Sequence, residues 1–300
     1  MREQITCYGH GMADPLLSSW SRTLRARNRS ERTIESYTVD LRDLGIFMAP
    51  VDLTEATKAH LEGFLEHERN LGKAPATVAR RYRSMQQFFN WLIDEDEITV
   101  SPMAKMKPPH VVQQPPAIFS DDSLKVLLKA CEGRTHEHLR DTAMVRLLDT
   151  TGIRAAELMG LSVADIDLNT NTFTVTGKGN RKRIVGLLPK SAEALDRYLR
   201  VRRKHPAAVT GALWLGVKGP LQQSALNQML ERRSIAAGIP PINPHAFRHR
   251  FAHRAKSAGM SDGDLMSLAG WKSPQMLHRY GASAAAERAI DSHRRLMGEQ

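Results

Sequence analysis

The 300-residue sequence is poor in cysteine and contains no long apolar segment. Because Cys7 and Cys131 are the only cysteines, neither a disulfide framework nor a four-cysteine metal site is available. No apolar run approaches the roughly 20 residues needed to cross a bilayer. The N-terminal stretch MREQITCYGHGMADP also lacks the apolar centre of a signal peptide. These absences predict a protein that works in a reduced, intracellular compartment.

What the sequence does contain is an excess of positive charge. The 43 Lys and Arg residues outnumber the 32 Asp and Glu residues, which gives a formal net charge of +11. Such an excess favours a polyanionic partner, most often nucleic acid. Hydrophobic residues make up 41% and charged residues 25%, as in ordinary globular chains. The length suits one or two domains.

Apolar spacing predicts an all-helical first domain over residues 14–100. Apolar residues recur at three- and four-residue steps in TIESYTVDLRDLGIFMA and in ATVARRYRSMQQFFNWLI, and a further helix is expected to begin at the cap Thr54. Arginines fall largely off the apolar stripes, which predicts a basic surface. Its members are Arg80, Arg81, Arg83 and the arginines between residues 22 and 32.

The rest of the chain predicts a linker and a second domain. Residues 101–118 include the proline pairs Pro108–Pro109 and Pro115–Pro116 and show no periodic apolar pattern, which indicates an extended linker. From residue 119 to 300 the patterns are mostly helical, but TFTV and RIVGLL around the turn TGKGN predict a β-hairpin. A helix is expected to end at Gly152, and His136 and His138 are expected in a loop. Further helices are predicted around 191–203, 224–237, 245–258 and 261–269. The predicted fold class is mainly α with a small antiparallel β-sheet.

The stretch HAFRHRFAH places His245, His249 and His253 on one helix face, as in a zinc site. However, no carboxylate or thiolate lies between them, and two intervening arginines would repel a divalent cation. A phosphate site fits better. Pro244 suits a helix start, His245 would then lie at the positive helix end, and Arg248 carries a fork that matches phosphate oxygens. We expect His249 and His253 to be structural or solvent-facing.

Four other stretches extend this hypothesis. TGIRAAEL places an arginine after a glycine at a helix start with a glutamate one turn later, and TGKGNRKR places a lysine at a hairpin tip. LAGWKS contains a tryptophan after a short helix, and HRYG contains a tyrosine. The glutamate is Glu157, and the residues that carry the hypothesis are, in order, Arg154, Lys178, His245, Arg248, Trp271 and Tyr280. In order and spacing they resemble the tyrosine site-specific recombinases of the phage-integrase family, over nearly the whole chain. The resemblance implies a helical, SAM-like core-binding domain followed by an α+β catalytic domain.

The resemblance also implies cleavage of a DNA strand. Arg154 and Arg248 would clamp the non-bridging oxygens of the scissile phosphate. Tyr280 would attack phosphorus and give a 3′-phosphotyrosyl bond and a free 5′-hydroxyl. That bond retains the energy of the ester, so rejoining needs no nucleotide cofactor. No cofactor or metal is expected.

The remaining candidates have supporting roles in this scheme. Lys178 would protonate the departing 5′-oxygen, and His245 would bind the phosphate and help to remove the tyrosine proton. Trp271 stands where many family members have histidine; its indole N–H can donate a hydrogen bond but cannot shuttle a proton. Glu157 is expected to orient the pocket.

The expected partner is double-stranded DNA with specific attachment sites. The two domains would clamp it in a salt-dependent manner. Phosphate contacts are expected from Arg80, Arg81, Arg83, Lys182 and Arg183. The resemblance further implies a homotetramer on synapsed DNA, with a C-terminal tail that docks on a neighbouring subunit, host DNA-bending or directionality factors, and a location at the nucleoid in the bacterial cytoplasm.

Two alternative functions share these residues. One is a topoisomerase-like enzyme that nicks and reseals DNA, and the other is a catalytically inactive DNA-binding regulator. The compact two-domain layout favours recombination over the topoisomerase-like enzyme, and the complete residue set argues against the inactive regulator. The sequence leaves open whether the recombinase acts in phage integration, element mobility or chromosome resolution. Only about 13 residues precede the helical bundle, too few for the arm-site binding domain of larger phage integrases, so a compact form is expected.

Overall fold

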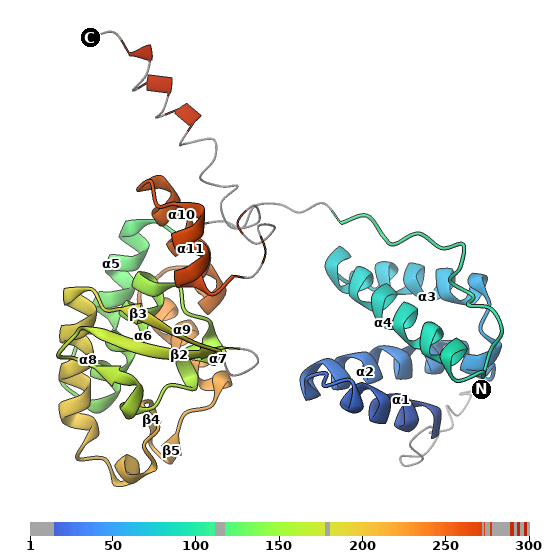
Figure 1. The fold of residues 1–300 in the computed structure, drawn as a ribbon, viewed down its shortest axis with the longest axis horizontal. Coiled ribbons are helices and arrows are strands. Elements are labelled where there is room, and N and C mark those ends of the chain that lie inside the picture. The colour runs from blue at the N-terminus through green and yellow to red at the C-terminus, as the bar shows by residue number, and fades with distance from the viewer. Residues whose placement is uncertain are drawn as a thin grey trace, which may run out of the picture. The chain divides into compact units, whose positions relative to one another are not determined.

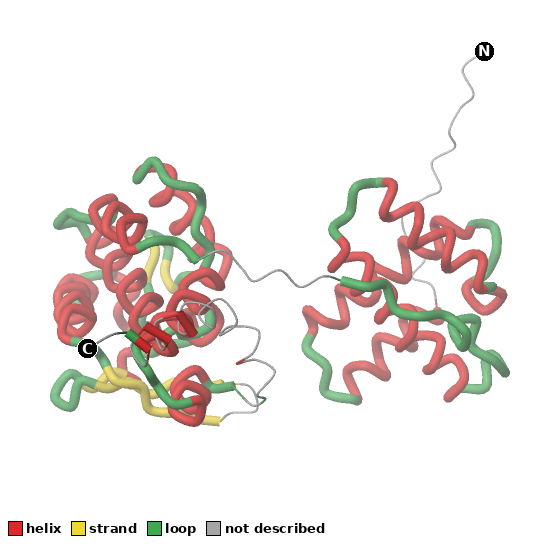
Figure 2. The backbone as a smooth tube through the Cα atoms, turned by 90° about the horizontal axis from the view of Figure 1, so that it is seen from above, coloured by secondary structure: helices red, strands yellow, loops and turns green. Residues whose placement is uncertain are grey.

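The computed structural model describes most of the chain, in two compact units of residues 1–113 and 114–300. The described residues are 15–111, 118–177, 181–271, 273, 277, 289–290, 293–294 and 297–298. Helices dominate both units, and the strands lie in the second (Figure 2). Among the described helices, none is both long enough and apolar enough to cross a membrane.

The first unit is a bundle of helices (Figure 1). Its elements are α1 (Pro15–Ala26), α2 (Glu31–Met48), the 3₁₀ helix η1 (Leu53–Glu55), α3 (Lys58–Asn70) and α4 (Pro75–Asp94). The structure confirms the two helices expected from apolar spacing but adds α1, which overlaps the start of the arginine-rich stretch. Leu17, Trp20 and Leu24 form its buried side. The Trp20 ring packs 5.3 Å from that of Trp91, so α1 belongs to the core.

The expected start of α3 was wrong. Asp52 accepts the N–H of Thr54 and caps the short helix η1. Thr57, three residues after the predicted cap, accepts the N–H of His60 and begins α3. Thr57, and not Thr54, is therefore the residue that caps the start of α3.

The basic surface predicted for α4 also needs a correction, because Arg81 faces the interior. This residue is 6% exposed. Its guanidinium lies 2.9 Å from the Glu68 carboxylate and 2.8 Å from that of Asp43. Arg81 follows Val78 by one turn and so lies on the buried stripe, where a cation requires paired carboxylates. Its placement favours a structural role, whereas Arg83 is exposed.

The chain after α4 remains packed on the bundle. Met103 is buried, and the Tyr82 hydroxyl donates to the carbonyl of Met106 at 3.0 Å. Residues 101–106 thus add to the packing of the first unit, although we expected the linker to begin at residue 101. Residues 112–117 lie outside the described part of the chain.

The second unit combines helices with a small antiparallel sheet of strand order β1-β2-β3 (Figure 1). Its elements are α5 (Asp121–Ala130), α6 (His136–Thr151), α7 (Ala155–Met159), η2 (Val163–Asp165), β1 (Ile166–Asp167), β2 (Thr172–Gly177), β3 (Arg181–Gly186), α8 (Pro189–Arg202), η3 (Pro206–Thr210), β4 (Leu215–Gly216), β5 (Gly219–Pro220), α9 (Gln223–Ala236), α10 (Pro244–Ser257) and α11 (Asp262–Ala269). The predicted fold class, hairpin and last four helices are confirmed.

Details around α6 show one success and one error. Gly152 ends the helix in the left-handed conformation, with φ of 57°, as expected for a glycine there. His136 and His138 lie in the first turn of α6, because the Thr135 side chain accepts the N–H of His138 and caps the helix. The prediction that these histidines lie in a loop was wrong.

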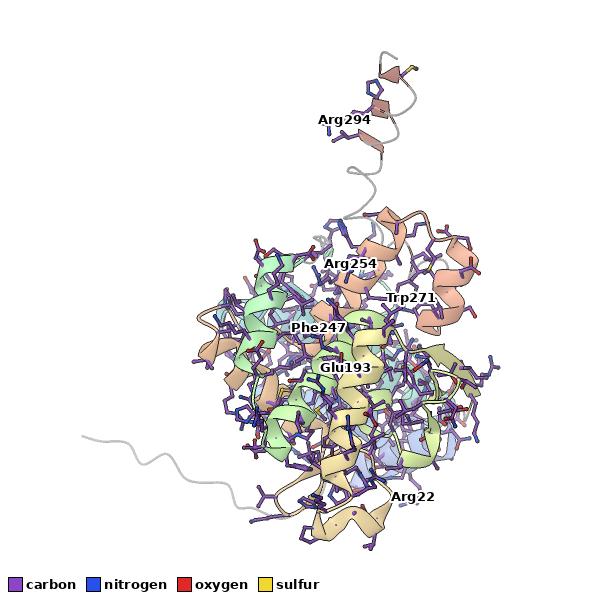
Figure 3. The ribbon with its side chains drawn as sticks, turned by 90° about the vertical axis from the view of Figure 1, so that its left-hand side faces the viewer. Arg22, Glu193, Phe247, Arg254, Trp271 and Arg294 are labelled. Carbon is purple, nitrogen blue, oxygen red and sulfur yellow. The ribbon has the colours of Figure 1, made fainter. Side chains whose placement is uncertain are left out.

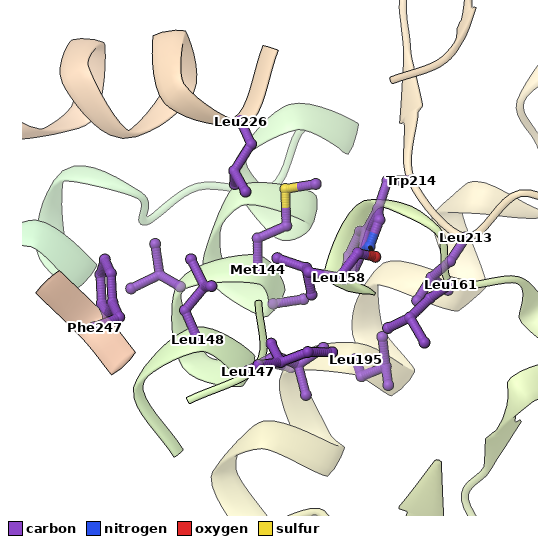
Figure 4. Packing of buried hydrophobic residues seen from close by; sticks show 14 of the residues in the cluster. Met144, Leu147, Leu148, Leu158, Leu161, Leu195, Leu213, Trp214, Leu226 and Phe247 are labelled. Carbon is purple, nitrogen blue, oxygen red and sulfur yellow. Dashed lines mark hydrogen bonds between the residues drawn. The ribbon is translucent and has the colours of Figure 1, made fainter. Parts of the chain in front are cut away.

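The core of this unit fixes the elements that carry the candidate site. Leu147 and Leu148 of α6 lie at its centre, and Leu158 of α7, Leu195 of α8 and Phe247 of α10 pack around them (Figure 4). All five side chains are almost completely buried. The starts of α7 and α10 are therefore anchored, and each carries an arginine that the sequence singled out.

Candidate functional site

Arg154 begins the short helix α7, directly after the turn at Gly152 and Ile153. Its backbone N–H donates to the carboxylate of Glu157 at 3.1 Å, and its side chain donates to the same carboxylate at 2.8 Å. These two hydrogen bonds fix Arg154 at the helix start, which is the position that the motif TGIRAAEL predicted. The Arg154 side chain nevertheless remains 41% exposed.

Glu157 is a buried carboxylate that links two arginines. Besides Arg154, it accepts two hydrogen bonds from Arg183, from Nη1 at 3.1 Å and from Nη2 at 2.8 Å. Burial raises the pKa of Glu157, but the hydrogen bonds and charge of Arg183, followed by those of Arg154, hold it below its ordinary value. The carboxylate is therefore ionised at neutral pH and orients both guanidinium groups, in keeping with its expected role.

Arg183 belongs to this cluster, whereas the sequence grouped it with Lys182 as a DNA contact. On β3 the side chains alternate, so Lys182 is exposed while Arg183 is only 16% exposed. The Nε of Arg183 donates to the carbonyl of Leu268 at 3.0 Å. The signal that could have placed Arg183 is its two-residue spacing from Val185, a buried residue on the same strand face.

Arg248 reaches the same region from α10. It is 2% exposed and donates to the carbonyl of Gly152 at 2.7 Å and to that of Ala269 at 2.6 Å. Its guanidinium carbon lies 5.1 Å from the centre of the Trp271 ring, a cation–π contact. Trp271 (Figure 3) is separated from α11 by the single residue Gly270 and is itself buried.

The end of α11 is the point where these side chains meet. The last carbonyls of a helix have no partner within it, and here each of three consecutive carbonyls accepts from a different arginine. Arg183 donates a hydrogen bond to the carbonyl of Leu268, Arg248 donates to that of Ala269, and Arg154 donates to that of Gly270. Positive groups also suit the negative end of a helix. Three guanidinium groups against the single Glu157 carboxylate leave two positive charges, which suits a phosphate diester.

His245 lies at the second position of α10 and is exposed. Asn243 caps this helix by accepting the N–H of Ala246, and Pro244 is its first residue, as predicted. The ring of His249 lies 5.2 Å from that of His245 and is buried. Among the described residues, no three His, Cys, Asp or Glu side chains gather as a metal site.

The structure thus brings Arg154, Arg248 and Trp271 together, and it places His245 three positions before Arg248 on the same helix. Lys178 and Tyr280 lie outside the described residues. Residues 172–177 and 181–186 form two paired antiparallel strands, and Lys178 lies between them in the sequence.

Of the other residues expected to contact DNA, three have described surroundings distinct from this cluster. Arg80 donates to the Ser36 hydroxyl at 2.6 Å and also to Asp40. Arg83 is exposed, with its Nε donating to the carbonyl of Ala79 at 3.3 Å. Lys182 is exposed on β3.

Comparison with known proteins places this arrangement in a family. The chain is 28% identical to tyrosine recombinase XerC of Corynebacterium efficiens over 268 residues, which cover 89% of this chain and 85% of the relative. The fold matches the XerH site-specific recombinase bound to a palindromic difH substrate, with a TM-score of 0.74 at 19% identity over 92% of this chain and 83% of that one. It also matches a lambda integrase tetramer bound to a Holliday junction, with a TM-score of 0.72 at 19% identity over 88% and 76%.

Two family descriptions match by sequence. Residues 17–96 match the phage integrase N-terminal SAM-like domain, and residues 118–287 match the phage integrase family. The second match covers more than half of the chain and includes the whole arginine cluster. The chain therefore belongs to the phage integrase family.

Proposed function

We propose that this chain is a site-specific recombinase that cuts and rejoins DNA strands through a 3′-phosphotyrosyl intermediate on Tyr280 and a Holliday junction. One observation carries the proposal. Arg154 and Arg248, which are distant in sequence, converge with Trp271 on the end of α11. They do so in a chain whose relatives are named tyrosine recombinases.

In this reaction the two arginines stabilise the charge that develops on phosphorus-bound oxygens. Among the described residues, only two of the five N–H donors of Arg154 meet an acceptor. Its remaining donors and its exposure suit direct binding of the non-bridging oxygens. The buried Arg248 adds a second positive charge beneath them, where low dielectric strengthens it. Trp271 holds the Arg248 plane through its ring.

Tyr280 then attacks phosphorus as the bond from phosphorus to the 5′-oxygen breaks. His245 accepts the tyrosine proton, and Lys178 donates a proton to the departing 5′-oxygen. The 3′-phosphate becomes a tyrosyl ester, so a 5′-hydroxyl from another strand can reverse the step without a cofactor.

We further propose that Arg80, Arg83 and Lys182 contact DNA phosphates and that Arg81 acts within the bundle. The domains of the proposed enzyme are the helical unit near residues 14–100, a linker to residue 118 and the catalytic unit from 119 to 300. The enzyme works in the bacterial cytoplasm, at the nucleoid, and host DNA-bending or directionality factors are candidate partners.

Recombination would use four protomers on two DNA sites. A cavity of about 480 Å³ in the second unit supports docking of a neighbour's tail, because it is lined mainly by apolar residues, among them Leu187, Phe251 and Leu268. The tail carries exposed apolar residues, Ile290 and Met297. A protein lacking residues 282–300 should therefore bind single sites but fail to form four-protomer synapses. Full synapsis without the tail would contradict this part of the proposal.

The test of the reaction begins with duplexes selected for binding from a randomised library. A nick beside the cleavage position lets the 5′-hydroxyl fragment diffuse away, so that the covalent product accumulates. The wild-type protein should form a protein–DNA adduct and Tyr280→Phe, with equal binding, should form none. Adduct formation without strand exchange between two labelled duplexes would indicate the topoisomerase-like enzyme. Binding without any adduct would indicate the regulator.

A further inference from the structure

Arg183 lies on the buried face of β3, although its charge suggests an exposed position. In the antiparallel register it lies opposite Val175, a buried residue of β2. Its neighbour Ile184 is 70% exposed, so the outward face of the strand is the one that Ile184 and Lys182 share. Arg183 therefore points to the protein side of the sheet.

All three nitrogens of the Arg183 guanidinium meet protein acceptors. Nη1 and Nη2 form a two-pronged contact with Glu157, and Nε donates to the carbonyl of Leu268. Such a fork needs the planar shape of arginine, since the ammonium of lysine is a point donor that cannot span two carboxylate oxygens and a third acceptor. This geometry leaves Arg183 unsuited to a phosphate contact.

The contact between Arg183 and Glu157 affects Arg154. Both arginines donate to the same oxygen of Glu157, Arg154 at 2.8 Å and Arg183 at 3.1 Å. Without Arg183, the full charge of the carboxylate would act on Arg154 and draw it away from a bound phosphate. The end of α11 would also lose the donor that holds Leu268.

The same pair lies against the base of the hairpin. A Cβ atom at Gly177 would stand 3.6 Å from Oε1 of Glu157 and 3.9 Å from Nη1 of Arg183. Gly177 is the last residue of β2 before Lys178. The contact between Arg183 and Glu157 therefore joins the strand that leads to Lys178, the start of α7 and the end of α11.

We propose that Arg183 is a positioning residue of the cleavage site, which fixes Glu157 and the end of α11 so that Arg154 faces the scissile phosphate. This inference rests on the proposed function, because it assumes that the cluster cleaves DNA. It also replaces the DNA contact that the sequence suggested for Arg183.

The test compares Arg183→Lys with Arg197→Lys in the full-length protein. Arg197 is a matched control because it also pairs with a glutamate, Glu193, but at an exposed helical site where the side chains are 59% and 58% exposed. Cleavage of the selected nicked duplex is measured in single turnover at saturating protein, and the Kd is measured separately. Arg183→Lys should cleave bound duplex about 10²-fold more slowly, the cost of a misplacement of about 1 Å, with an unchanged Kd. Arg197→Lys should match the wild type in both.

Three outcomes overturn or separate the claims. Cleavage by Arg183→Lys at the Arg197→Lys rate overturns the inference, as does weaker binding with unchanged cleavage of bound duplex, which would indicate a DNA contact. If the wild type forms no adduct, the proposed function fails instead.

A second variant applies if Arg183→Lys is too unstable to assay. The double substitution of E157Q with R183Q preserves the summed charge of the two groups, but it shortens the arginine side chain and loses the charged fork. Slow cleavage with a native-like Tm supports the inference, and cleavage at the wild-type rate overturns it.

Discussion

Gly270 offers a direct test of how closely the arginines must approach the end of α11. Its φ is +62°, a left-handed conformation. A Cβ atom there would lie 3.0 Å from Nη1 and 3.1 Å from Cζ of Arg183, and 3.4 Å from Nη1 of Arg154. Gly270→Ala thus introduces both backbone strain and a steric push on the Arg183 guanidinium, with the Arg154 guanidinium at the limit of ordinary contact.

Gly238→Ala separates these two effects. Gly238 has a similar φ of +67°, but a Cβ atom there would meet no heavy atom within 4 Å. Both substitutions should cost about 1–2 kcal/mol of unfolding free energy from the left-handed backbone. For a unit of this size that lowers the Tm by roughly 2–8 °C.

Only Gly270→Ala should impair the reaction. Moving the Arg183 guanidinium, which shares Glu157 with Arg154, by a few tenths of an ångström is a fraction of the 1 Å that costs roughly 10²-fold, so we expect about a tenfold slower cleavage of bound duplex. Thermal unfolding and single-turnover cleavage of the nicked duplex measure the two effects. Equal slowing by Gly270→Ala and Gly238→Ala would refute the reasoning that arginine placement, and not stability, limits cleavage.

Three further predictions follow from the buried and exposed charges. Arg81→Ala leaves carboxylates of α2 and α3 without their buried cation and should lower the unfolding free energy by about 3–5 kcal/mol; a loss below about 0.5 kcal/mol in urea unfolding would be typical of a surface residue. Lys182→Ala should weaken binding to all duplexes and reduce the slope of log Kd against log salt by about 1; a constant slope would remove Lys182 from the DNA surface. Because the pKa of Glu157 is lowered from 4.5, its stabilising contribution is complete above pH 4.5 and is lost as the pH falls through the lowered pKa. The unfolding free energy of the wild type should then fall more steeply below pH 4.5 than that of Glu157→Gln, and parallel curves would contradict this assignment.

Residue type predicts structure well where the contacts that determine it lie within a few residues. Gly152 ends a helix and Arg154 begins the next one, because a left-handed glycine and a backbone bond to Glu157 act within a few residues. Apolar spacing located the long helices for the same reason. Signals of this kind need no knowledge of what lies across the fold.

Two of the errors came from reading charge as exposure. Arg81 follows the buried Val78 by three positions on a helix, and Arg183 precedes the buried Val185 by two positions on a strand. In both cases the periodicity indicated an inward side chain, and only the charge argued against it. The carboxylates that make burial favourable come from other elements, such as Glu68 on α3, so the sequence alone could not show that a partner was present.

No sequence pattern could predict that the arginines meet at the end of α11, because the groups that accept their hydrogen bonds are backbone carbonyls. Two earlier carbonyls of α11 are satisfied locally, by the N–H groups of Gly270 and Trp271, and the next three accept from arginines of three other elements. The arginines thus satisfy the last carbonyls of the helix, and their three positive charges still exceed the single negative charge of Glu157. A phosphate bound by the remaining donors of Arg154 would share that guanidinium with the Gly270 carbonyl. Substrate binding and the order of the segment that leads to Trp271 are therefore physically linked.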